Sequence, residues 1–128
     1  MKIDNILLDK LTAQAKESPR LRMNLDLRNS DGDSSQRMLN AIEPGSVVPI
    51  HRHQKTSETM VVLRGCVVEE YYSDEGEVVA SYELAAGCAL NIPAGQWHSL
   101  RALESGTVIL EMKDGAYEPI SPADILSM

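Results

Sequence analysis

The sequence predicts an all-β domain, a sandwich or barrel of short strands, with one short helix in front of it. The first observation is a series of short apolar or alternating runs, separated by turn residues such as Gly, Pro, Asp and Ser. The second is helical spacing of apolar residues near the N-terminus. The third is length, because 128 residues suffice for one core. We expect one domain over residues 1–128: a helix within 1–19, a β-barrel over 20–117 and a tail over 118–128.

The helix is predicted over residues 4–17. Asp4 or Asn5 can cap its first turn, and Pro19 ends it because the residue before a proline avoids helical backbone angles. An apolar stripe at helical spacing consists of Leu7, Leu8, Leu11 and Ala15. Such a stripe indicates a helix that packs on the barrel wall.

The strands are predicted from alternation and from the turns between them. Arg20–Arg28 alternates strictly between apolar and polar residues, which predicts a half-buried strand whose polar side chains face water or line a pocket. The tail from residue 119 onward is expected to form a short helical turn or to fray. The other predicted strands are Gln36–Ile42, Thr59–Leu63, Cys66–Tyr72, Val78–Leu84, Ala89–Ile92, Trp97–Leu103 and Thr107–Lys113.

The charge balance limits the partners. The chain has 12 basic and 19 acidic residues, a formal net charge of −7, which argues against nucleic acid and anionic membrane surfaces. No apolar run approaches the roughly 20 residues of a membrane span, and the first residues lack the features of a signal peptide. We therefore expect a cytoplasmic protein, in which Cys66 and Cys88 are free thiols.

The three histidines and one glutamate form the strongest functional pattern. His51 and His53 stand one residue apart, so in an extended strand their side chains leave the same face. The polar residues 54–57 can supply a turn that brings Glu58 back to that face. His98 follows a turn marked by Pro and Gly, where the chain can re-enter a strand. Imidazole nitrogens and a carboxylate suit a first-row divalent metal, so we predict these four residues as metal ligands.

The spacing of these residues resembles the two signature motifs of the cupin superfamily. The first motif, G-x5-H-x-H-x4-E-x6-G, is complete from Gly45 to Gly65, and the second, G-x5-P-x-G-x2-H, runs from Gly87 to His98. Four residues after that histidine the family places Asn, where this chain has Ala102, which weakens inference about the substrate more than about the metal. The resemblance implies a double-sheet jelly-roll barrel of the cupin, RmlC-like type.

Shorter segments resemble a narrower group, the WbuC-type cupin-fold metalloproteins. These segments are Ser18–Arg20, Gln36–Ala41, Pro49–His53 and Glu111–Gly115. Members are small single-domain cupins often associated with bacterial surface-polysaccharide biosynthesis. The resemblance implies a homodimer, since related small cupins usually pair through sheet edges.

The predicted ligand set constrains the chemistry without choosing the metal. Three neutral imidazoles and one carboxylate around a divalent ion leave a net charge of about +1, which would attract an anionic or hydroxylated small molecule. Fe, Mn, Ni and Zn all remain possible, because availability often decides which ion is bound. Zinc prefers four ligands, so a zinc form would keep no open position and would look structural.

Catalysis needs a group that can exchange a proton with a bound substrate. We choose Glu111 as the candidate catalytic residue, although it can equally face outward beside Lys113; strand parity puts these two side chains on one face without saying which. The candidate substrate-binding residues are Arg22, Gln36, Arg64, Tyr82 and Trp97.

Three functions remain open at the level of the sequence. The first is a metal-dependent isomerase or epimerase that acts on a sugar or nucleotide-sugar, which rests partly on the family resemblance. The second is an iron-dependent dioxygenase of a small molecule, which open positions on the ion would permit. The third is a non-catalytic module that binds or senses a ligand, although the sequence shows no second domain through which to report binding.

Overall fold

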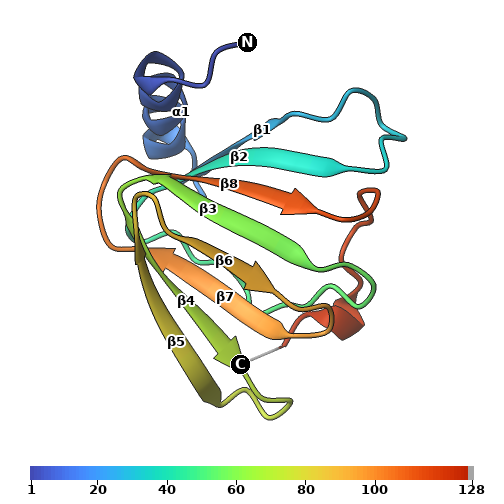
Figure 1. The fold of residues 1–128 in the computed structure, drawn as a ribbon. Coiled ribbons are helices and arrows are strands. Elements are labelled where there is room, and N and C mark those ends of the chain that lie inside the picture. Colours follow the sequence, from blue (N-terminus) through green and yellow to red (C-terminus); the bar gives the residue numbers. More distant parts are fainter. Residues whose placement is uncertain (127–128) are drawn as a thin grey trace.

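The computed structural model describes residues 1–126 and contains two antiparallel β-sheets and one α-helix (Figure 1). Helix α1 spans Asn5–Glu17, and a 3-10 helix, η1, spans Pro122–Asp124. The eight strands are β1 Arg22–Asp26, β2 Gln36–Ile42, β3 Glu58–Arg64, β4 Cys66–Tyr72, β5 Val78–Ala85, β6 Ala89–Ile92, β7 Trp97–Ala102 and β8 Thr107–Lys113. The predicted strands are therefore present, most of them to within two residues at each end.

The strands form a large sheet in the order β1-β2-β8-β3-β6 and a small sheet in the order β5-β4-β7. One buried apolar cluster draws residues from both sheets, so it is the core between them: Ile42, Met60, Val62, Val67, Leu84, Ala102 and Ile109. Two facing antiparallel sheets around a shared core confirm the predicted jelly roll. Burial of these side chains is the main favourable contribution to folding.

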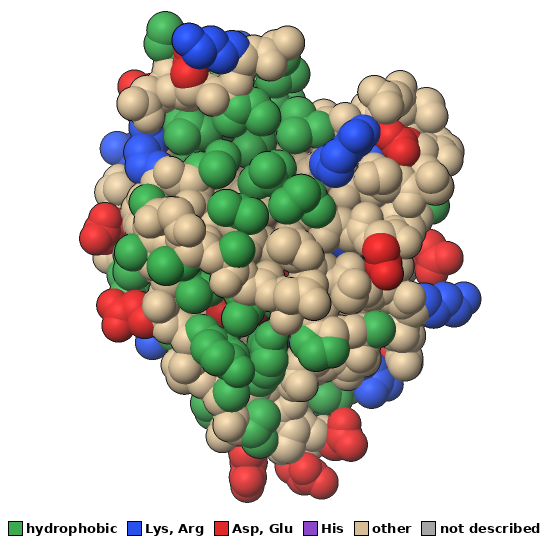
Figure 2. Space-filling view, viewed as in Figure 1, with side chains coloured by type: hydrophobic (Ala, Val, Ile, Leu, Met, Phe, Trp, Pro, Cys, Tyr) green, Lys and Arg blue, Asp and Glu red, His purple; other side chains and the backbone are tan. Residues whose placement is uncertain are grey.

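Helix α1 covers the outer face of the large sheet. Its N-cap is Asp4, whose carboxylate accepts a hydrogen bond from the Leu7 amide at 3.2 Å. The helix and the sheet share a second buried cluster, formed by Leu8, Leu11, Ala15, Leu39, Ala41 and Val108. Figure 2 shows apolar side chains gathered below the helix, while acidic side chains gather at the opposite end, around the turn between β4 and β5. The predicted packing of the helix on the barrel wall is confirmed.

Gly65 makes the tight turn between β3 and β4. Its φ is +87°, and a Cβ atom added there would collide with the side chain and backbone of Thr107. The position therefore requires glycine both for its backbone angle and for the close approach of β8.

The C-terminal segment packs across one end of the barrel. Ile125 forms an isolated β-bridge with His51, and the Leu126 amide donates a hydrogen bond to the Ile50 carbonyl at 2.9 Å. The guanidinium of Arg52 donates to the Asp124 carboxylate at 2.9 Å. The tail thus forms the predicted helical turn, η1, while residues 127–128 of the predicted tail lie outside the described residues. Among residues 1–126, no helix is long and apolar enough to cross a membrane.

Candidate metal centre and ligand cavities

Backbone pairing brings the first and last histidines together. The His51 amide donates to the His98 carbonyl at 3.0 Å, and the His98 amide donates to the His51 carbonyl at 2.8 Å. This reciprocal pair fixes the two residues opposite each other. Their ring centroids are 4.4 Å apart, and the ring of His53 lies 5.2 Å from that of His51. The three imidazoles therefore gather at one point, as the spacing predicts.

The size of this histidine cluster matches a metal ion. One nitrogen from each of His51, His53 and His98 lies within 4.8 Å of the other two. Three neighbouring ligands, each about 2.1 Å from one ion, lie about 3.0–3.4 Å apart. The three nitrogens thus need to approach one another by up to about 2 Å to share an ion.

Hydrogen bonds to the other ring nitrogens orient two of these imidazoles. His51 Nδ1 lies 2.8 Å from the Pro49 carbonyl, and His98 Nδ1 lies 2.7 Å from Glu69 Oε1. A carbonyl or carboxylate at Nδ1 leaves Nε2 free as a ligand, which is the usual arrangement around protein metals. His98 Nε2 is buried and has no hydrogen-bond partner among the described residues. A buried nitrogen without a hydrogen-bond partner is unusual, and a bound metal ion would supply that partner.

All three imidazoles are neutral at pH 7. Burial lowers the pKa of His51 to about 4, with a further lowering by His98, and burial also lowers the pKa of His98 to about 4. Burial and the charge of Lys113 lower the pKa of His53 to about 3. Because a metal binds only the deprotonated ring, these shifts favour coordination over protonation.

Glu58 adjoins the cluster on strand β3. It is 5% exposed, and its Oε2 lies 3.9 Å from His98 Nε2, although it is not part of the tight three-histidine group. Adjacent ligands on one ion lie about 3 Å apart, so coordination by Glu58 requires a side-chain movement of about 1 Å. Burial, followed by repulsion from Glu111, raises the pKa of Glu58 well above its usual range. A cation at this point would stabilise the ionised carboxylate of Glu58.

A cavity of about 220 Å³ opens beside the histidine cluster, bordered by His51, His98 and Glu58. Glu111 and Arg22 line it, so two of the predicted site residues face this space. The remaining lining residues are Asn40, Ile42, Val48, Pro49, Leu100, Ile120 and Ile125. The Asn40 amide donates to Glu111 Oε1 at 3.2 Å, which orients that carboxylate. We name this space the inner cavity.

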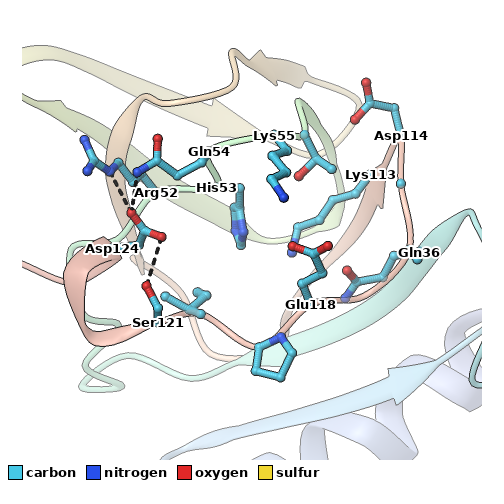
Figure 3. Close-up of a pocket in the computed structure, with 15 residues that line it drawn as sticks. Gln36, Arg52, His53, Gln54, Lys55, Lys113, Asp114, Glu118, Ser121 and Asp124 are labelled. Atoms are coloured by element: carbon cyan, nitrogen blue, oxygen red, sulfur yellow. Dashed lines mark hydrogen bonds and ion pairs between the residues drawn. The ribbon is translucent and has the colours of Figure 1, made fainter.

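A second space of about 480 Å³ is bordered by His53, and we name it the outer cavity (Figure 3). Gln36 lines it, together with Lys113, whose Nζ is 4.0 Å from Glu58 Oε1. Glu111 and Lys113 therefore both point inward from β8, as their shared strand parity predicts, but they border different cavities. Ile120 of the tail borders both spaces.

The other three candidate binding residues do not border either cavity. Arg64 binds helix α1 instead, through Asp9 at 2.7 Å, and also donates to the Gly106 carbonyl at 2.8 Å. Tyr82 packs edge-on against a neighbouring ring of the small sheet, with centroids 5.3 Å apart. Trp97 is 6% exposed, and its indole donates to Asp74 at 2.9 Å.

Two residues of the site were not predicted. Glu69 is fully buried against His98, and burial, followed by repulsion from Glu111, raises its pKa to about 9. Strand parity could have found it, because Glu69 shares a face of β4 with the buried Val67 and Tyr71. Asn40 likewise shares a face with Ile42 on β2. Neither belongs to a motif with metal-ligand spacing.

Comparison with known proteins identifies the family and the fold. A family model described as "Domain of unknown function (DUF6016)" matches residues 3–84. No curated protein matches the sequence. Among solved structures, KdgF from Halomonas sp. superposes with a TM-score of 0.63 and 19% identity, covering 78% of this chain and 84% of that one.

Two further structures have the same fold. Oxalate oxidase in complex with glycolate has a TM-score of 0.65 at 17% identity, covering 81% of this chain and 56% of that one. The pro-11S globulin of pumpkin has a TM-score of 0.66 at 17% identity, covering 78% of this chain and 27% of that one. At these identities the likeness concerns the fold alone. The chain belongs to the DUF6016 family and has the cupin fold.

Proposed function

We propose that the protein is a cupin that holds a divalent transition metal through His51, His53, His98 and Glu58. The observation that carries the proposal is the convergence of three neutral imidazoles, with the buried His98 Nε2 lacking any partner among the described residues. The hydrogen bonds at Nδ1 of His51 and His98 support the same assignment, because they direct the remaining nitrogens toward one point. Fe, Mn, Ni and Zn all suit this donor set.

We further propose that a small anionic or hydroxylated molecule binds in the inner cavity. A bound metal supplies a Lewis acid and a net positive charge there. Arg22 offers a guanidinium to an anionic or hydroxyl oxygen, and burial lowers the pKa of Arg22 without discharging it at pH 7. The cavity lies below the about 300 Å³ at which pockets for drug-sized ligands begin, so it suits one small reacting group.

The reaction class that the site supports best is proton transfer, as in an isomerase or epimerase. Glu111 faces the inner cavity, and Asn40 holds its carboxylate in place. Glu111 lies beside Glu58 at the edge of this cavity, so its carboxylate can exchange a proton with a ligand bound there. The resemblance to WbuC-type cupins supports a sugar or nucleotide-sugar of surface-polysaccharide biosynthesis as the substrate, with the protein acting as a cytoplasmic homodimer.

The test combines metal analysis with proton exchange. Protein loaded separately with each of the four metals is incubated in D₂O with a panel of nucleotide-sugars, and NMR measures deuterium incorporation. We expect incorporation with the wild type and at least a 100-fold loss in Glu111→Gln, with unchanged metal content. A wild type that retains no metal, or a Glu111→Gln variant as active as the wild type, would contradict the proposal. Oxygen consumption by the iron form would instead favour the dioxygenase.

A further inference from the structure

The outer cavity is a polar space with cationic groups directed into it. The ammonium groups of Lys55 and Lys113 point toward its centre, the neutral ring of His53 also faces it, and Gln36 lies at its side (Figure 3). Since His53 belongs to the histidine cluster and Ile120 borders both cavities, the outer cavity adjoins the proposed metal position. A ligand at the metal can therefore extend into it.

The two lysines keep most of their charge available for a ligand. The nearest carboxylate to Lys113 is Glu58, 4.0 Å away, which is too long for a hydrogen bond, while the Lys113 side chain is only 12% exposed. Lys55 has no carboxylate within 4.0 Å among residues 1–126. Two ammonium groups thus face the same space without a close ion pair.

Gln36 adds a polar group that lines the cavity. The residue is 7% exposed, and among the described residues its side-chain amide makes no hydrogen bond. The amide atoms keep some contact with solvent, so the amide is open to a group that enters the cavity. Its NH₂ group can donate to an oxygen that also receives a hydrogen bond from a lysine.

The acidic residues around the cavity are mostly engaged elsewhere. Asp114 accepts a hydrogen bond from the Ser57 amide at 3.0 Å, and Asp124 accepts from Arg52 and Gln54, both at 2.9 Å. The remaining acid is Glu118, which lies across from Lys113 and faces the cavity (Figure 3). The groups free to act on a ligand are therefore two cations, one amide and one opposing carboxylate.

We propose that the outer cavity binds a phosphate or carboxylate group of a ligand whose hydroxylated end reaches the metal. Lys55, Lys113 and Gln36 donate to the anionic oxygens, and Glu118 opposes the charge and limits affinity. This inference rests on the proposed function, because the metal holds the other end of the ligand. The substrate class is accordingly a small hydroxylated acid or phosphate ester with its charged group several bonds from its chelating group.

The test measures the affinity of nickel-loaded protein for three ligands by calorimetry. The ligands share a 2-hydroxy-acid group, which would bind the metal, and differ at their other end. Glycerate ends in a neutral hydroxymethyl group, malate in a carboxylate and 3-phosphoglycerate in a phosphate. We expect malate, 3-phosphoglycerate or both to bind about tenfold more tightly than glycerate, the gain of a charge-assisted hydrogen bond. The preferred probe tells carboxylate from phosphate. Equal affinities for all three would overturn the proposal.

Charge variants of opposite sign make the test specific. Lys55→Met is expected to remove most of the preference without changing the affinity for glycerate, whereas Glu118→Gln is expected to strengthen binding of the charged probes. Lys16→Met, on the exposed face of helix α1, is the control and should leave all three affinities unchanged. A Lys55→Met variant that behaves like Lys16→Met would refute the role of the outer cavity.

The metal proposal can fail separately. If elemental analysis finds no metal in the wild type after reconstitution, the proposed function fails, and the cavity is then probed with inorganic phosphate on the metal-free protein. Phosphate-induced NMR shifts of the Gln36 amide that Lys55→Met abolishes would support the anion site. Shifts that Lys55→Met leaves intact, or no shifts at all, would overturn it.

Discussion

The buried carboxyl group of Glu69 offers a specific test of the metal centre. Its Oε1 lies 2.7 Å from His98 Nδ1, and its side chain is fully buried. In Glu69→Gln the amide oxygen can still accept a hydrogen bond from Nδ1–H, but the negative charge that stabilises a metal-bound imidazole is absent. The substitution therefore removes charge and keeps shape.

The expected magnitude follows from the role of such outer carboxylates. Their loss typically weakens metal binding 10- to 100-fold, which corresponds to about 1.4–2.7 kcal/mol. Folding should change little, because burial raises the pKa of Glu69 to about 9, so the side chain is already neutral at pH 7 in the metal-free protein. We expect the free energy of unfolding of metal-free Glu69→Gln to lie within about 1 kcal/mol of the wild type.

Competition with a chromophoric chelator at pH 7 measures the affinity, and urea denaturation of the metal-free protein measures the stability. The matched control is Glu70→Gln at the next position, where the carboxylate pairs with Arg101 at 2.8 Å. Glu70→Gln should bind metal like the wild type. Unchanged affinity in Glu69→Gln, or equal losses in both variants, would refute the assignment of Glu69 to the centre.

Three further predictions concern stability. The metal-free protein should lose stability between pH 6.5 and 9, because Glu69, with its pKa raised to about 9, stays protonated when folded and ionises when unfolded. The folded state then binds more protons, so the free energy of unfolding falls with rising pH. Glu69 alone contributes about 3 kcal/mol to this fall, and Glu58, whose pKa is also raised, adds a loss of the same sign. Urea titrations in EDTA that show a flat or rising profile would contradict this. The buried histidines, with pKa values lowered to about 4, reduce stability only as the pH falls below 6.5. Gly65→Ala should lower the free energy of unfolding by about 2–4 kcal/mol in the same assay. The control, Gly87→Ala, should lower it by about 1 kcal/mol, because φ is similar there but no atom lies within 4 Å of the added Cβ. Equal losses in the two variants would contradict the steric argument. Arg64→Ala should cost about 1–2 kcal/mol, because Arg64 donates hydrogen bonds to Asp9 of helix α1 and to the Gly106 carbonyl. Protection of the helix amides from hydrogen exchange should fall first.

The motif residues could be predicted because their positions follow from local rules. His51 and His53 share a face through the two-residue period of extended backbone, and the Pro-Gly turn before His98 returns the chain to the same end of the barrel. Strand β2 was predicted with the bounds observed, Gln36–Ile42, because turn residues flank it on both sides. The two-residue period of the strands and the turn residues between them are thus sufficient to predict the strands and the convergence of the histidines.

The placement of single side chains often depends on irregularities that the pattern does not reveal. The register of β3 against β8 shifts between Val62 and Arg64, so Arg64 leaves the alternation that points Val62 into the core and turns to helix α1. Strand parity alone could have excluded Trp97 from the substrate-binding residues. It is adjacent to His98 in β7, so its side chain points to the other face of that strand. The approach of Ile125 to His51 joins distant parts of the chain, and no local rule predicts it.

The backbone of His51 is held from two sides, by residue 98 in β7 and by residue 125 in the tail. Three stretches separated by dozens of residues therefore meet as a miniature three-stranded ribbon around one imidazole. During synthesis this ribbon cannot close until the segment around Ile125 has been made, although the strands of both sheets precede that segment in the chain. The histidine cluster is thereby coupled to a segment that contributes no histidine to it.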